Sequence, residues 1–167
     1  MKCLIVYRSR HGTTRKVVHQ LAAGLAPVAD VTTVDLSASR APDLSLFDTV
    51  IIGGSIHAGQ IQKEIISYCM HQTPQLLTKQ LGVFICYMNK KEGVAELQKA
   101  FSPALLQHAA ATGLFGGELL FEKMNFFEKL IVRKVSGVKQ SISALDQPAI
   151  ESFLNQMRQP VDLAVEV

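Results

Sequence analysis

The sequence predicts an α/β domain in which helices cover both faces of a parallel sheet. Short apolar segments rich in β-branched residues alternate along the chain with longer segments whose apolar residues recur at helical spacing. The apolar segments are mostly continuous, as in strands that are buried on both faces. The chain has 167 residues, 48% of them hydrophobic and 19% charged, which suits one domain with a two-sided core. We therefore expect one doubly wound domain over residues 1–167, with right-handed crossovers.

The elements follow in order from the periodicity. Strands are expected at residues 2–7, 31–36, 47–54, 81–88 and 114–120, the second of them at an edge of the sheet. Helices are expected at residues 13–25, 61–70 and 92–111, the last with a break near Pro103. A final helix begins after Asp146, which is a typical capping residue. Residues 121–143, between the fifth strand and this helix, exceed what a five-strand domain needs.

A polar turn separates the first strand from the first helix. Its hydroxyls, at Ser9, Thr13 and Thr14, and its glycine, Gly12, lie where the helix begins. A helix N-terminus has unpaired N–H groups and the positive end of the helix dipole, so this turn suits a phosphate group. It has neither the Gly-Lys-Ser/Thr of a Walker loop nor the G-x-G-x-x-G of a dinucleotide-binding turn. The alternative is a hydroxyl-capped turn that binds no ligand.

Two further loops belong with this turn if the strands lie in the order 2-1-3-4-5. The carboxyl ends of strands 1, 3 and 4 then meet at the switch point, where ligands bind. The third strand leads into residues 53–59 (GGSIHAG), whose glycines let the backbone approach a flat ligand. The fourth ends at Tyr87, Met88 and Asn89. Tyr87 is expected either to stack on a planar ring or to close the end of the core.

The remaining titratable residues exclude several classes of site. His11 and His57 fall in the ligand loops, and His57 is the one candidate for catalysis, as a proton shuttle. We find no Ser-His-Asp order, no paired carboxylates and no metal-ligand spacing, so no metal site is expected. Cys3, Cys69 and Cys86 are odd in number and are expected to be buried, reduced thiols.

Bulk charge and hydropathy limit the partners and the location. A net charge of +3 is too small to indicate nucleic-acid binding, and no basic-aromatic pattern supports it. No apolar run approaches the ~18–20 residues that span a bilayer, and the apolar N-terminal segment is too short for a secretory signal. We therefore expect a cytoplasmic protein, with peripheral contact to the inner face of the cell membrane as a further option.

The turn Ser9-x-His11-Gly12-Thr13-Thr14 resembles the Ser/Thr-x-Thr-Gly-x-Thr loop with which flavodoxins hold the phosphate of FMN. This resemblance implies a flavodoxin-like three-layer sandwich, with a five-stranded parallel sheet in the order 2-1-3-4-5 and an insertion before the last helix. It also implies that FMN is the cofactor. The implied FMN-binding residues are Ser9, Arg10, His11, Gly12, Thr13, Thr14, Ser55, Ile56, His57, Ala58, Gly59, Tyr87, Met88 and Asn89.

One branch of the family, the menaquinone-dependent protoporphyrinogen oxidases, is similar at further positions. Its members have arginines where Arg10 and Arg15 stand, a G-x-S-I segment like residues 53–56, and an aromatic and basic insertion like residues 121–130. The resemblance implies an FMN-dependent oxidoreductase that removes hydrogens from protoporphyrinogen IX in two-electron steps and passes electrons to menaquinone. A tetrapyrrole and a quinone would then be its partners.

The insertion also has a physical interpretation. Residues 123–140 contain five basic residues against the single acid Glu128, a net +4 that exceeds the charge of the whole chain. The apolar residues Met124, Phe127, Ile131 and Val135 share one helical face. Such a segment suits a membrane surface, a quinone or an anionic tetrapyrrole. The alternative is a helix packed on the edge of the sheet with a solvated basic side.

Two other functions remain open. Flavodoxins that serve as electron carriers are strongly acidic, which steers them to basic partners, whereas this chain is basic. A carrier for a protein partner is therefore the second hypothesis. A binding module on the same fold that has lost its flavin is the third. Fold alone does not decide among them, and the sequence leaves the oligomeric state open.

Overall fold

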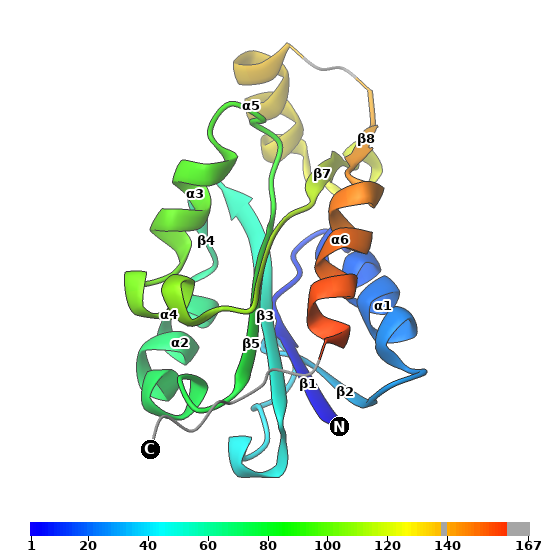
Figure 1. Cartoon of the computed structure of the whole chain (residues 1–167). Coiled ribbons are helices and arrows are strands. Elements are labelled where there is room, and N and C mark those ends of the chain that lie inside the picture. The colour runs from blue at the N-terminus through cyan, green and yellow to red at the C-terminus, as the bar shows by residue number, and fades with distance from the viewer. Residues whose placement is uncertain (138–139, 160–167) are drawn as a thin grey trace.

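A parallel sheet forms the centre of the molecule in the computed structural model, which describes residues 1–137 and 140–159 (Figure 1). Its parallel strands run in the order β2-β1-β3-β5-β6. Their bounds are Lys2–Tyr7 for β1, Asp30–Asp35 for β2, Thr49–His57 for β3, Gln80–Cys86 for β5 and Ala111–Leu114 for β6. The short strand β4 (Gln60–Ile61) pairs antiparallel with the end of β3. The predicted order 2-1-3-4-5, with the second strand at an edge, is confirmed.

Helices cover both faces of this sheet (Figure 1). The helices α1 and α6 lie on one face, and α2, α3 and α4 lie on the other. Their bounds are Thr13–Leu25 for α1, Lys63–Leu76 for α2, Gly93–Ala100 for α3, Pro103–His108 for α4 and Gln147–Arg158 for α6. The helix α5 (Phe126–Ser136) lies beyond the carboxyl edge of the sheet (Figure 1). The three-layer architecture is the predicted one.

The first strand shows why its sequence is continuously apolar. Leu4 and Val6 belong to the core beneath α2, α3 and α4, whereas Cys3 and Ile5 belong to the core beneath α1 and α6. Successive side chains of a strand point to opposite faces, so a strand between two helical layers needs apolar residues at every position. All four side chains have 0% exposure. The three cysteines of the chain are buried and free, as predicted.

The predicted fifth strand at residues 114–120 is wrong, because the structure divides this region between two sheets. The parallel strand β6 ends at Leu114, where the prediction began. Gly116 then has φ +68°, a left-handed conformation that turns the chain out of the central sheet. The next strand, β7 (Gly116–Leu119), pairs antiparallel with β8 (Ile142–Leu145) in a separate two-stranded sheet.

Two helix boundaries also differ from the prediction. The break expected near Pro103 is confirmed: α3 ends at Ala100, and the Ser102 hydroxyl accepts the N–H of Leu105 to cap α4. The helix nevertheless stops at His108, since Ala111 already belongs to β6. The second helix begins at Lys63 rather than at residue 61 and continues to Leu76, because Ile61 is part of β4. None of the helices in the described residues is long and apolar enough to cross a membrane.

The insertion is ordered around α5. Asn125 and Glu128 form a capping box at its start: the Asn125 side chain accepts the N–H of Glu128, and the Glu128 side chain accepts the N–H of Asn125. The helix ends at Gly137, which has φ +69°. Its apolar residues are not packed on the sheet edge as the alternative interpretation required, for Phe126 and Phe127 are each 74% exposed. Lys139, part of the predicted basic segment, lies outside the described residues.

Candidate functional site

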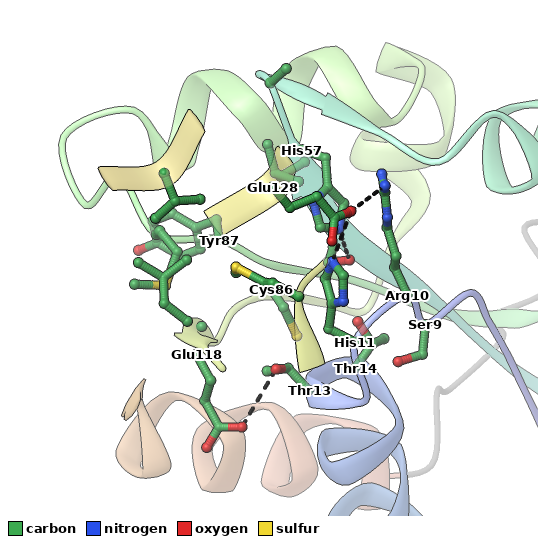
Figure 2. A pocket seen from close by; sticks show the side chains of 18 of the residues that line it. Ser9, Arg10, His11, Thr13, Thr14, His57, Cys86, Tyr87, Glu118 and Glu128 are labelled. Carbon is green, nitrogen blue, oxygen red and sulfur yellow. Dashed lines mark hydrogen bonds and ion pairs between the residues drawn. The ribbon is translucent and has the colours of Figure 1, made fainter. Parts of the chain in front are cut away.

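A cavity of about 350 Å³ lies at the carboxyl end of the sheet, where the loops after β1, β3 and β5 meet (Figure 2). The first loop lines it with Ser9, Arg10, His11, Thr13 and Thr14. The second loop contributes Ser55, Ile56, His57 and Ala58, and the third contributes Tyr87 and Met88. These predicted residues therefore converge on one cavity, whose volume falls in the range of small-ligand sites, roughly 300–1,000 Å³. The predicted residues Gly12, Gly59 and Asn89 do not line it.

The first loop starts α1 at the edge of the cavity. The buried Ser9 hydroxyl accepts the N–H of Gly12 at 3.1 Å and that of Arg15 at 3.4 Å. Gly12 has φ +97°, which turns the chain into α1 and explains the need for glycine. Gly12, the cap residue, has no side chain that could bond to the helix, and the first turn of α1 contains no acidic residue. The positive end of the α1 dipole is thus directed to the cavity.

The Thr14 hydroxyl stands out among the polar groups of this loop. It is buried beside the Cys86 thiol, yet its oxygen has no hydrogen-bond partner of good geometry among the described residues. Burial of an unpaired hydroxyl is costly, and such groups ordinarily find a protein or ligand partner. Thr14 lines the cavity at the N-terminus of α1, where an anionic ligand would supply an acceptor. The donors of this loop therefore fit a phosphate group.

The second loop is fixed by Gln62. Its side-chain oxygen accepts the backbone N–H of Ser55 at 3.1 Å, and its amide nitrogen donates to the Ser55 hydroxyl at 2.7 Å. The same hydroxyl lies 3.0 Å from Nε2 of His57. Ala58 and Gly59, with φ +49° and +73°, then turn the chain from β3 into β4. Left-handed backbone at a non-glycine residue such as Ala58 is uncommon, and such conformations cluster at ligand sites.

His57 is a neutral imidazole near pH 7. Burial, followed by the positive charges of His11 and Arg10, lowers the pKa of His57 to about 4. A general acid or base works best when its pKa is near the working pH. His57 is therefore suited to accepting or donating a hydrogen bond in the cavity rather than to carrying charge.

The third loop divides its residues between core and cavity. Tyr87 packs against the core beneath α2, α3 and α4, as one alternative expected, and it also lines the cavity. Its stacking on a planar ring stays a prediction. Gly93 is needed opposite, because a Cβ there would lie 2.6 Å from Cε2 of Tyr87. The Asn89 side chain accepts the N–H of Lys91 at 3.3 Å within its own loop instead of facing the cavity.

A carboxylate of the insertion reaches the first loop. Glu128 of α5 is paired with the Arg10 guanidinium, and its Oε1 lies 3.7 Å from Nε2 of His11. Figure 2 shows Arg10 and His11 both turned toward this carboxylate. Burial raises the pKa of Glu128, but the N–H of Asn125 and the charges of Arg10 and His11 outweigh burial and place it below its ordinary value.

A second carboxylate, Glu118 of β7, lies at the other end of the same loop. It accepts hydrogen bonds from Lys16 at 2.8 Å, from the Ser143 hydroxyl at 2.7 Å and from the Thr13 hydroxyl at 3.4 Å. Burial raises the pKa of this carboxyl as well, yet the bonds from Lys16 and Ser143 lower it further, so the group is ionised. The two-stranded sheet is thereby attached to the start of α1.

Sequence reasoning missed the part of the cavity wall that comes from beyond β6. These lining residues are Gly117, Glu118, Leu119, Met124, Glu128, Ile131 and Val132, and Cys86 at the end of β5 joins them. One signal for Glu128 was present, since Asn125-x-x-Glu128 is a capping-box pattern and Glu128 is the only acid among residues 123–140. Nothing in the sequence marked Glu118.

The side chains that line the cavity determine which kinds of ligand it can bind. It offers cationic and hydroxyl groups at one end and apolar or aromatic walls at the other, which suits a ligand with a phosphate and a flat ring. No group of three or more His, Cys, Asp or Glu that could hold a metal ion occurs in residues 1–137 and 140–159.

Comparison with known proteins assigns the family. The model of the flavodoxin domain matches residues 4–144. The chain therefore belongs to the flavodoxin-domain family. Among curated proteins it is 24% identical over 153 residues to a protein named protoporphyrinogen IX dehydrogenase (quinone) from Leishmania major. That match covers 81% of this chain but 64% of the relative, so the chain spans less than two thirds of the relative's length.

Solved structures share the fold. The rubredoxin oxygen:oxidoreductase of Desulfovibrio gigas superposes with a TM-score of 0.59 and 14% identity, over 94% of this chain and 34% of that one. The flavodoxin of Streptococcus pneumoniae TIGR4 superposes with a TM-score of 0.56 and 19% identity, over 95% of both chains. At these identities the likeness establishes the flavodoxin-like fold.

Proposed function

We propose that this chain binds FMN noncovalently in the cavity at the carboxyl end of the sheet. The observation that carries the proposal is the buried, unpartnered Thr14 hydroxyl at the open N-terminus of α1. A phosphate there would receive a hydrogen bond from Thr14 and the positive charge of Arg10. Membership of the flavodoxin-domain family supports the same ligand.

The other two loops would hold the ring. Tyr87 and Ile56 provide apolar wall, and the left-handed backbone at Ala58 would bring main-chain polar groups to the ring edge. His57 would offer a neutral imidazole beside them, held by the Ser55 hydroxyl. When bound, FMN supplies the electron chemistry of its isoalloxazine ring, while the protein supplies orientation and electrostatics.

The finer proposal is an oxidoreductase that takes hydrogens from a porphyrinogen and delivers electrons to a quinone. Its support is the similarity to the Leishmania major protein, whose name states that activity, together with the arginines and the insertion noted in the sequence. The apolar side of the cavity is walled by Met124, Ile131 and Val132 of the insertion. A flat, largely apolar substrate would approach the ring past these side chains.

The insertion would also bring the protein to a membrane that contains the quinone. Phe126, Phe127 and Val135 are exposed on α5 (74%, 74% and 81%). Lys129, Arg133 and Lys134 lie on the same helix. Exposed aromatic residues beside basic ones bind anionic lipid surfaces. The proposed location is therefore the cytoplasmic face of the cell membrane, with α5 as the peripheral contact.

A second candidate is an electron carrier for a protein partner. The superposition on the Streptococcus pneumoniae flavodoxin over 95% of both chains favours it. The net charge of +3 weighs against it, because acidic surfaces steer carriers to basic partners.

An anaerobic assay separates the two candidates. The protein with FMN, given protoporphyrinogen IX and a menaquinone analogue, should form fluorescent protoporphyrin only when both protein and quinone are present. FMN alone, at the same concentration, is the control for uncatalysed oxidation. A failure with every quinone tested would overturn the enzyme proposal. A stable semiquinone, with turnover only when a reductase is added, would establish the carrier instead.

A further inference from the structure

The ion pairs of Glu128 connect the insertion to the loop at the start of α1. The carboxylate is paired with Arg10 and lies 3.7 Å from the His11 imidazole. Both partners line the cavity and stand in the loop that would hold a ligand phosphate. An anion supplied by the chain itself therefore pairs with the Arg10 guanidinium, which a phosphate would use, and lies next to the His11 ring.

Glu128 has a second role that is separable from its charge. One of its oxygens accepts the N–H of Asn125 at 3.1 Å and closes the capping box of α5. Glutamine serves the capping box as well as glutamate does. A change to glutamine thus keeps the start of α5 and removes the negative charge next to Arg10.

Among the described residues, α5 meets the rest of the protein at the cavity, which Glu128, Ile131 and Val132 line. No described α5 side chain belongs to either buried core. Ile131 lines the cavity, and Arg133 lies with Cζ 6.0 Å from the Phe121 ring centroid. The ion pair with Arg10 is thus a principal polar link between α5 and the first loop.

We propose that Glu128 is a specificity-determining residue of this site: its carboxylate competes with a ligand phosphate for Arg10 and His11. Glu128 thereby lowers the preference of the site for phosphorylated over unphosphorylated flavin. When a phosphate occupies the loop, Glu128 loses its contact with Arg10, and the start of α5 is released from the loop. This inference rests on the proposed flavin site. The physical reason is that two anions sharing one cationic group repel each other, most strongly where water is partly excluded.

Paired binding measurements test the competition. The affinities of FMN and riboflavin are measured by flavin fluorescence for the native protein, for E128Q, and for E122Q as a control. Glu122 is an exposed acid of the same insertion and has the same charge. We expect E128Q to tighten FMN about three- to tenfold and leave riboflavin unchanged, and E122Q to change neither. Weaker FMN binding in E128Q, an equal effect on riboflavin, or an equal gain in E122Q would overturn the proposal.

Hydrogen exchange tests the release of α5 without any flavin. Inorganic phosphate is added to the native protein, and amide exchange of α5 is followed by mass spectrometry. Phosphate should speed exchange in α5 of the native protein. In E128Q the capping box is kept but the link to Arg10 is lost, so α5 should exchange fast without phosphate and at the same rate when phosphate is added. Exchange that phosphate leaves unchanged in the native protein contradicts the inference. If FMN does not bind but phosphate still releases α5, the flavin proposal fails while the competition at the loop stands.

Discussion

The Ser55 hydroxyl lies 3.0 Å from Nε2 of His57, in the wall of the cavity. The same hydroxyl accepts a hydrogen bond from the Gln62 amide at 2.7 Å, so Gln62 holds it beside the imidazole. One ring nitrogen of a neutral histidine donates and the other accepts, and the Ser55 hydroxyl can partner Nε2 in either tautomer. A histidine whose pKa is lowered to about 4 is thereby held in place near His11 and Arg10.

His57 should titrate far below an ordinary histidine. Burial and the neighbouring positive charges lower its pKa to about 4 from the usual 6.5. The imidazole signals of His57 in an NMR titration, assigned with H57Q, should stay unchanged from pH 8 down to about 5. A midpoint near 6.5 would show that the ring is solvated and free of these charges.

The same shift makes stability depend on pH. The unfolded chain binds a proton at His57 below about pH 6.5, whereas the folded chain does so near pH 4, so the folded state loses stability as the pH falls through this interval. As the pH falls from about 6.5 to about 4, the melting temperature of the native protein should decline more steeply than that of H57Q. Equal declines in the two proteins would assign the acid sensitivity to other groups.

Replacing Thr14 with valine should separate binding from stability. Valine keeps the shape of threonine and removes a buried hydroxyl that has no partner in the described residues, so the melting temperature should hold or rise slightly. If the hydroxyl donates to a ligand phosphate, T14V should weaken FMN about tenfold or more, the usual effect of losing a hydrogen bond to a charged group. Riboflavin, which lacks the phosphate, is the matched control, and an equal loss for both ligands would count against a phosphate at Thr14.

Gly116 should be the most sensitive glycine at the boundary between the two sheets. It has φ +68°, and a Cβ there would lie 2.1 Å from the Ala144 carbonyl oxygen. We expect G116A to destabilise the fold by about 3 kcal/mol, since backbone strain adds to a clash with main chain. G137A is the control, because Gly137 has φ +69° but open space around it, and should cost about 1 kcal/mol. Equal costs in urea unfolding would show that the clash at Gly116 relaxes.

The exposed phenylalanines of α5 should matter for lipid binding and not for folding. Phe126 and Phe127 are each 74% exposed, so changing both to serine should leave the melting temperature within about 1 °C. Co-sedimentation with vesicles that contain anionic lipid should fall several-fold. L46S, at an equally apolar position that is 58% exposed and far along the chain from the insertion, should bind like the native protein. Unchanged binding by the double variant would remove α5 as the membrane contact.

The central sheet and the three loops could be predicted because local signals and the fold agree there. The break after Tyr7, the hydroxyls at Ser9, Thr13 and Thr14, and the helical spacing that follows are all readable within a few residues. The predicted order of strands then places the loops together without any knowledge of side-chain contacts. The expected role of Gly53 and Gly54 is wrong: Phe84 and Gln62 fill the space where a Cβ would stand, so these glycines serve packing and do not line the cavity.

The rest of the site depends on contacts between distant residues. Glu118 pairs with Lys16, and Glu128 pairs with Arg10. The partners in each pair are more than a hundred residues apart, so no local sequence pattern predicts the pairing. The split between β6 and β7 was missed because residues 114–120 are apolar enough for one strand, while the turn is determined by the conformation of Gly116 and its fit beside Ala144. Sequence patterns indicate that a strand is buried, but they do not indicate to which sheet the strand belongs.

A titration of the purified protein with FMN tests the central claim most directly. FMN is added, excess is removed, and the visible spectrum and flavin fluorescence are recorded together with the protein concentration. We expect flavin bands that titrate to one FMN per chain, with binding weakened by T14V. A colourless protein that takes up no FMN would contradict it and would reduce the turn at Ser9, Gly12 and Thr14 to a helix cap.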